Sequence, residues 1–154
     1  MGKVIKKNID PTHYHKLSKI LDLVSDVCGI SKDTLKSTDR HRSVVDARRV
    51  YVVLSRLHLG LTLELISGFI GKDHASALYY IEQHDGLTKS DAAYRNNFRT
   101  SEQILLSNFS QITKTRSLLD LLIEDNISLK EALDDLKEKI EIIETTLKIK
   151  SNEN

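Results

Sequence analysis

A cluster of basic side chains lies between positions 36 and 56 of the chain. It consists of Lys36, Arg40, Arg42, Arg48, Arg49 and Arg56, against only Asp39 and Asp46 in the same stretch. Guanidinium groups bind phosphate through a planar fork, and ammonium groups bind it as point charges. A solvated charged face is the simpler interpretation of such a cluster, and contact with a polyanion is the functional one.

The distribution of charge along the whole chain agrees with the second interpretation. The 154 residues carry 23 Lys and Arg against 22 Asp and Glu, a net charge of +1. Residues 1–89 hold 14 basic and 10 acidic side chains, whereas residues 90–154 hold 9 and 12. A basic first part and an acidic tail indicate two separate tasks, and the first part is the one suited to a polyanion.

Other chemistry finds no support in the residue types. The spacing of the six histidines lacks a zinc-ligand pattern, and a single cysteine, Cys28, excludes a Cys-based zinc site. Residues 68–73 contain Gly-Lys without the rest of a phosphate loop, and no nucleophile elbow is present. No metal, no cofactor and no enzyme activity are therefore expected. No apolar run approaches the ~20 residues that cross a bilayer, so a cytoplasmic protein without membrane contact is predicted.

The apolar residues recur at helical spacing almost throughout, which predicts an all-α fold. Helices are expected over residues 12–28, 32–36, 44–59, 63–70 and 73–84, with a polar loop at 37–43. Ser31 and Thr62 are expected to cap helix starts, and Gly29 and Gly60 to end helices. The short helix 63–70, a tight turn at Gly71 and the helix that follows match a helix-turn-helix, whose second helix enters the major groove of DNA.

The dipeptide at positions 85–86, Asp-Gly, predicts a boundary between two parts. Residues 1–86 are assigned to the helix-turn-helix domain and residues 87–154 to a helical extension. Within the extension, one helix is expected through Phe109 and a second from about 117 to 150.

The tail shows a heptad pattern typical of a coiled coil. The a positions are Leu119, Asn126, Leu133, Ile140 and Leu147, and the d positions are Leu122, Leu129, Leu136 and Ile143. Such a seam predicts a homodimer through residues 118–150. Three alternatives stay open: an amphipathic helix folded back on the first domain, an intrachain hairpin of the tail that turns at 125–126, and a seam shortened by the capping box at 128–131.

Five segments in order carry a resemblance to a known family. They are the run 24–35, Arg40-His-Arg42, Arg48-Arg49, the apolar segment 63–66, and the run 71–76, Gly-Lys-Asp-His-Ala-Ser. In this order and spacing, residues 17–84 resemble the C-terminal DNA-binding domain (domain IV) of the bacterial replication initiator DnaA. The resemblance implies a Trp-repressor-like helix-turn-helix and double-stranded DNA as the partner. The initiator's ATPase domain has no counterpart here.

The resemblance also assigns roles to individual residues. It implies that Asp73, His74, Ala75 and Ser76 read bases in the major groove. It implies that Arg42 enters the minor groove with Arg40 beside it, and that Lys72 holds a phosphate. Arg48 and Arg49 complete the DNA-binding set expected from the basic cluster.

Several positions depart from the family pattern. Ala75 replaces a threonine, Asp46 and Ala47 replace Arg-Pro, and Arg49 replaces a glutamine. Because Asp46 removes a positive charge, the preferred DNA sequence is expected to differ from the usual initiator box. The function predicted is binding at DnaA-box-like sites, regulating replication or transcription without ATPase activity. The alternative is an adaptor that keeps the fold and uses its tail for protein partners.

Overall fold

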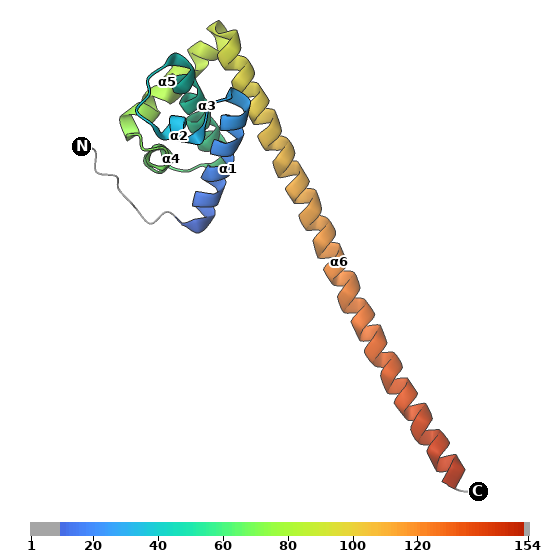
Figure 1. The fold of residues 1–154 in the computed structure, drawn as a ribbon. Helices are drawn as coiled ribbons and strands as arrows, with labels where there is room; N and C mark the ends of the chain where they lie inside the picture. The colour runs from blue at the N-terminus through green and yellow to red at the C-terminus, as the bar shows by residue number, and fades with distance from the viewer. Residues whose placement is uncertain (1–9, 153–154) are drawn as a thin grey trace. The chain divides into compact units, whose positions relative to one another are not determined.

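The structure, a computed structural model, describes residues 10–152 and is all-α, as predicted. The helices of this part are α1 (Pro11–Cys28), α2 (Lys32–Lys36), α3 (Arg42–Leu59), α4 (Leu63–Phe69), α5 (His74–Ser90) and α6 (Ala92–Asn152) (Figure 1). The chain divides after Ser107 into two compact units. The first nine residues of the predicted helix-turn-helix domain lie outside the described residues.

The predicted caps of the first unit are confirmed. The Ser31 and Thr62 side chains accept from backbone N–H groups three residues ahead, at Thr34 and Leu65. Gly29 and Gly60 end α1 and α3 in the left-handed conformation, at φ 66° and 63°. These signals are local, because each needs only a side chain or a φ angle within a few residues.

Helix α3 is the centre of the first unit. It packs against α1, α2, α4 and α5, and the side chains of Val50, Tyr51, Val52 and Leu54 are completely buried. A helix buried on nearly all sides needs apolar residues beyond one face, and the run at 50–54 supplies them. The remaining core comes mainly from Leu17, Ile20, Leu21 and Val24 of α1 and from Ile66 and Ile70 at α4.

Helices α4 and α5 form the predicted helix-turn-helix. After α4, the backbone N–H of Lys72 donates to the Ser67 carbonyl at 2.9 Å, and that of Gly71 donates to the Gly68 carbonyl at 3.1 Å. This pair of bonds is a Schellman motif, which requires the left-handed conformation that Gly71 adopts at φ 68°. Asp73 then caps α5 by accepting from the backbone N–H of Ser76.

The helix break predicted at positions 85–86 is wrong. Helix α5 passes through Gly86 and ends at Ser90, and Asp91 then accepts from the Tyr94 backbone N–H at the start of α6. The expected end rested on local propensity, and a glycine costs a helix only about 1 kcal/mol. Contacts between α5 and the first part of α6 outweigh that cost, and the first unit reaches Ser107.

His84 holds α5 to the first part of α6. Its Nδ1 lies 2.7 Å from the Tyr94 hydroxyl, and its ring lies 4.4 Å from that of Phe98. Burial lowers the pKa of His84 and the Arg49 charge acts in the same direction, whereas Asp85 and Glu102 partly oppose the shift. The folded state therefore favours the neutral imidazole.

A pH dependence follows from this shift. Since the pKa of His84 in the folded state lies below its ordinary value of 6.5, the unfolded state takes up the proton more readily as the pH falls through 6.5. The free energy of unfolding is expected to fall over that range. His84→Gln should flatten the slope, whereas His15→Gln, an exposed control, should not. Urea unfolding at pH values from about 5.5 to 7.5 measures it, and an unchanged slope in His84→Gln would contradict the assignment.

The second unit consists of residues 108–152, all in α6 and all exposed. The helix continues without interruption through the dipeptide at 125–126 and the predicted capping box at 128–131. The chain therefore does not turn there, and the hairpin and the shortened seam are both wrong. Asn126 is compatible with the helix because its amide donates to the Leu122 carbonyl at 3.0 Å. No helix within residues 10–152 combines the length and the apolar character that crossing a bilayer requires.

Candidate nucleic-acid interface

The N-terminus of α5 presents the predicted base-reading residues on the surface. His74 and Ala75 are exposed, and Ser76 is half-buried. Asp73 uses Oδ1 to cap the helix, 2.7 Å from the backbone nitrogen of Ser76. Hydrogen bonds from Ser76 lower the pKa of Asp73, so the carboxylate stays ionised at neutral pH. The cap fixes the backbone of this first turn, whose side chains face solvent.

Lys72 ties the turn of the helix-turn-helix to the loop between α2 and α3. Its Nζ donates to the Ser37 carbonyl at 2.6 Å. Burial lowers the pKa of Lys72, and the positive charges of Arg48 and Arg40 act in the same direction. The Lys72 ammonium is therefore held at the loop that carries Arg40, where the charges of Arg48 and Arg40 act on it.

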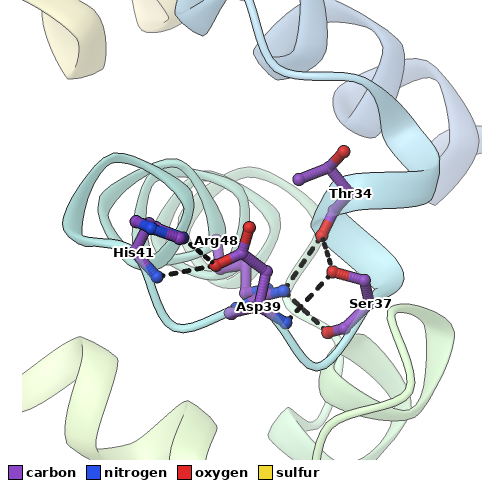
Figure 2. A network of polar contacts seen from close by, with 5 residues as sticks. All are labelled: Thr34, Ser37, Asp39, His41 and Arg48. Atoms are coloured by element: carbon purple, nitrogen blue, oxygen red, sulfur yellow. Dashed lines mark hydrogen bonds and ion pairs between the residues drawn. The ribbon is translucent and has the colours of Figure 1, made fainter.

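Arg48 lies inside the protein rather than on its surface. Its side chain reaches the α2 end and the loop that follows, and Figure 2 shows the guanidinium among their carbonyl groups. Nε donates to the Leu35 carbonyl at 2.7 Å, and Nη2 donates to those of Ser37 at 2.7 Å and Thr34 at 3.0 Å. Nη1 donates to the Asp39 carbonyl. Only 2% of the residue is exposed. Arg48 therefore clamps the loop in this conformation, and its burial opposes the predicted contact with DNA.

The same loop is ordered by a second set of bonds. The Asp39 carboxylate accepts from the His41 backbone nitrogen at 2.8 Å and lies 2.6 Å from the His41 Nδ1 (Figure 2). These bonds lower the pKa of Asp39. Arg40 lies between these two residues and is exposed. The loop therefore presents Arg40 to solvent on a backbone held from both sides.

Arg49 is also buried, with 5% of the residue exposed. Its Nη1 pairs with the Asp46 carboxylate, and its guanidinium carbon lies 5.7 Å from the ring centroids of both Tyr80 and Tyr94. The face of α3 that carries Arg49 is turned toward α5 and the first part of α6. This burial opposes the predicted contact of Arg49 with DNA, because the guanidinium is paired with Asp46 inside the unit, although its Nε has no hydrogen-bond partner there.

Arg42, at the start of α3, remains on the surface with a side chain that is 76% exposed. Its Nη2 lies 2.5 Å from the Asp91 carboxylate, and its Nε lies 3.7 Å from that of Asp46. A surface ion pair contributes about 0–1 kcal/mol. The two carboxylates are each only 18% exposed, so a phosphate competes with these acids for the exposed guanidinium. Asp91 is 49 positions away, and nothing in the sequence pointed to this pair.

Tyr79 is a surface residue that the sequence interpretation did not single out. It follows Ala75 by one helical turn on α5 and is 53% exposed. A residue four positions beyond a base-reading position lies on the same face of a helix, and this spacing is the signal by which the sequence could have indicated it. Tyr79 therefore extends the candidate surface along α5.

No metal-binding cluster was found among the residues that the structure describes. Among residues 10–152 there is no group of three or more His, Cys, Asp or Glu side chains able to hold an ion. What the surface contains is an exposed helix N-terminus with polar side chains and a set of cations beside it. Such an arrangement can bind an anionic polymer and contact base edges.

Comparisons with known proteins agree with this architecture. Residues 17–83 match the family model described as bacterial dnaA protein helix-turn-helix. The chromosomal replication initiator protein DnaA of Bacteroides fragilis is 30% identical over 94 residues, 58% of this chain and 20% of that protein. DnaA of Nostoc punctiforme is 33% identical over 94 residues, 60% of this chain and 20% of that protein.

The similarity is confined to one domain. The chain spans about a fifth of the length of these relatives, and the matched segment contains α2 to α4 with most of α1 and α5. A domain of this class is not itself catalytic. Residues 17–83 therefore form a helix-turn-helix domain of the kind found at the C-terminus of bacterial DnaA.

Proposed function

We propose that this chain binds double-stranded DNA at short DnaA-box-like sequences and regulates replication or transcription without ATPase activity of its own. The observation that carries the proposal is the exposed first turn of α5, capped by Asp73, next to Lys72 and to the loop at 37–41 on which Arg40 is exposed. In a helix-turn-helix protein this turn contacts base edges while neighbouring basic groups contact phosphates.

The side chains of this turn suit the major groove. The His74 imidazole can donate to or accept from a base edge, and the Ala75 methyl group can contact a thymine methyl. A carboxylate can accept from a cytosine amino group, which is the role proposed for Asp73 beyond its cap. Ser76 adds a hydroxyl close to the same edge.

The cations beside α5 suit the backbone and the minor groove. Lys72 and Arg40 are proposed to contact phosphates, because Lys72 is bonded to the loop on which Arg40 is exposed. Arg42 is proposed to enter the minor groove after leaving Asp91 and Asp46. A narrow minor groove rich in A·T pairs attracts arginine most strongly, so the flanks of the site should matter.

A comparison of two duplexes tests the proposal. Fluorescence anisotropy with the full chain, at two salt concentrations, should show tighter binding to a duplex carrying a DnaA box than to a scrambled one. The expected difference is roughly tenfold to a hundredfold, because each good base contact contributes about 1–3 kcal/mol of discrimination. Equal affinity for both duplexes at physiological salt would contradict sequence-specific binding.

Two observations favour an adaptor as the second candidate. Arg42 is paired with acids of its own chain, and α6 presents an apolar stripe with no partner within the second unit. A protein that had lost DNA binding would show both features. In the anisotropy experiment it would bind neither duplex, whereas its tail would still associate.

The tail contributes to the proposed function through association. We propose that residues 118–150 join two copies of the chain into a homodimer. Two linked readers bind two sites more tightly than two separate ones because the second contact is intramolecular.

A further inference from the structure

We infer that the tail pairs two copies of this chain as a parallel, in-register, two-stranded coiled coil in which Asn126 faces Asn126 of the second copy. The inference rests on the homodimer proposed above and adds its orientation, register and number of strands. It is argued from residues 118–150 of α6, a continuous helix whose side chains are all exposed.

The stripe that would form the seam is apolar and uncovered. Its a and d residues from Leu119 to Leu147 are between 51% and 69% exposed where they are apolar. Residues at both kinds of position, with Asn126 among them, line a shallow apolar groove along the helix. Soluble proteins rarely leave so long an apolar stripe in water, so this face requires an occupant.

Charge along the flanks identifies a second copy in parallel orientation as that occupant. In a parallel pair, each g residue lies beside the e residue five positions later on the other strand. This places Asp125 beside Lys130 and Lys139 beside Glu144, twice each by symmetry. The pair formed by Leu118 and Ile123 is apolar, and no like charges meet.

Asn126 supports the same arrangement. In a parallel, in-register pair the two a-position amides face each other and can bond across the seam, the arrangement by which a single polar residue specifies two strands. In an antiparallel pair a positions face d positions, so Asn126 would lie against Leu136 or Ile143 and leave a buried amide unpaired. There Lys130 would also meet Lys130 or Lys137 of the second copy.

The c positions, which lie outside the seam, bear on the number of strands. Leu121, Ile142 and Ile149 occupy c positions and stay exposed in the two-stranded arrangement. Ser128 and Asp135 lie on the same stripe between them, and burying these polar side chains opposes a third strand on that side. A parallel pair also brings both helix-turn-helix domains to the same end of the coil, since each precedes its own tail.

The first measurement is the mass of the full chain in solution by light scattering. We expect twice the chain mass of 17.5 kDa. Ile140→Asp, at an a position, should halve the measured mass, and Thr145→Asp, at the outward f position, should leave it unchanged. A monomer, a trimer or a tetramer for the unmodified chain would overturn the inference.

Orientation is tested by cross-linking in a Cys28→Ala background, which removes the natural thiol. Under mild oxidation Asn126→Cys should form a covalent dimer, whereas Ser128→Cys, at an outward c position, should not. In an antiparallel pair, position 126 lies opposite position 136 or 143, so the two positions 126 are at least ten residues apart along the coil. At about 1.5 Å per residue this is about 15 Å, beyond the reach of a disulfide. Absence of the covalent dimer from a dimeric Asn126→Cys variant would overturn the parallel arrangement.

A charge exchange checks orientation without cysteine. Asp125→Lys should weaken the dimer, because it places a second ammonium group beside Lys130 of the second copy. Adding Lys130→Asp should restore the dimer by making the pair opposite in charge again. Failure of the second change to restore the dimer would count against the parallel pairing.

The dimer and DNA binding can fail separately. Ile140→Asp should still bind a duplex with one box while losing its advantage on a duplex with two. If the unmodified dimer binds neither duplex, the DNA proposal fails and the coiled coil stands.

Discussion

An Arg48→Ala variant is expected to lose roughly 3–5 kcal/mol of unfolding free energy, because each bond from a charged donor contributes about 1.5–3 kcal/mol and some freed carbonyls regain water. The four carbonyls that Arg48 joins belong to Thr34, Leu35, Ser37 and Asp39. Such a loss is a large part of the stability of a small domain, typically about 5–15 kcal/mol.

Urea unfolding followed by tyrosine fluorescence measures this loss without a contribution from the tail. All five tyrosines lie before position 108, so the signal reports the first unit alone. Arg48→Lys should recover only part of the loss, because an ammonium lacks the planar fork that reaches several carbonyls. Arg56→Ala is the matched control, since Arg56 is exposed and donates to the Leu61 carbonyl alone.

The position of Arg48 also separates two explanations of lost DNA binding. If Arg48 acts as a clamp, any loss of DNA binding in Arg48→Ala should be accompanied by a loss of order in the loop. An Arg48→Ala variant of unchanged stability would contradict the clamp.

The second large effect is expected at the N-terminus of α5, where substitutions of His74 and of Lys72 in the preceding turn should change DNA binding in different ways. His74→Ala should reduce the preference for the box over a scrambled duplex by about 1–3 kcal/mol, roughly tenfold to a hundredfold. Lys72→Ala should weaken binding to both duplexes and reduce the salt slope by about one. The physical reason is that base edges differ from one DNA sequence to another, so a base contact affects discrimination. Phosphates are the same in every sequence, so a phosphate contact affects all affinities equally.

Anisotropy titrations over a series of salt concentrations measure both quantities. His15→Ala, an exposed histidine outside the candidate surface, should change neither. Because Lys72 also donates to the Ser37 carbonyl, the stability of Lys72→Ala must be measured alongside. If His74→Ala lowers affinity uniformly while discrimination survives, the assignment of α5 as the recognition helix is wrong.

Local signals explain why much of the fold was predictable from sequence. The cap at Ser31, the left-handed end at Gly60 and the run from Gly71 to Ser76 each act within a few residues. The start and end of several helices follow from them directly. The same run carried the resemblance to the DnaA domain, which the family comparison confirmed.

The failures at residues 85–86 and 125–131 have a common cause. Asp-Gly and a Ser-x-x-Glu motif are signals of helix ends, yet both segments are helical. At Gly86, contacts of His84 with Tyr94 and Phe98 favour continuation. At Asn126, the bond from its side chain to the Leu122 carbonyl keeps the amide within the helix. Local propensity is a weak preference that such contacts override.

The basic cluster shows most clearly what the sequence alone decides and what tertiary structure decides. The sequence places five arginines and a lysine just before a helix-turn-helix, which predicts a single basic surface formed by all six. Only the folded chain assigned Arg48 to four carbonyls, Arg49 to Asp46 and two tyrosine rings, and Arg42 to an acid 49 positions away. The physical reason is that a guanidinium binds a carbonyl or carboxylate of its own chain as readily as a phosphate, and burial, which depends on how helices pack, selects between them.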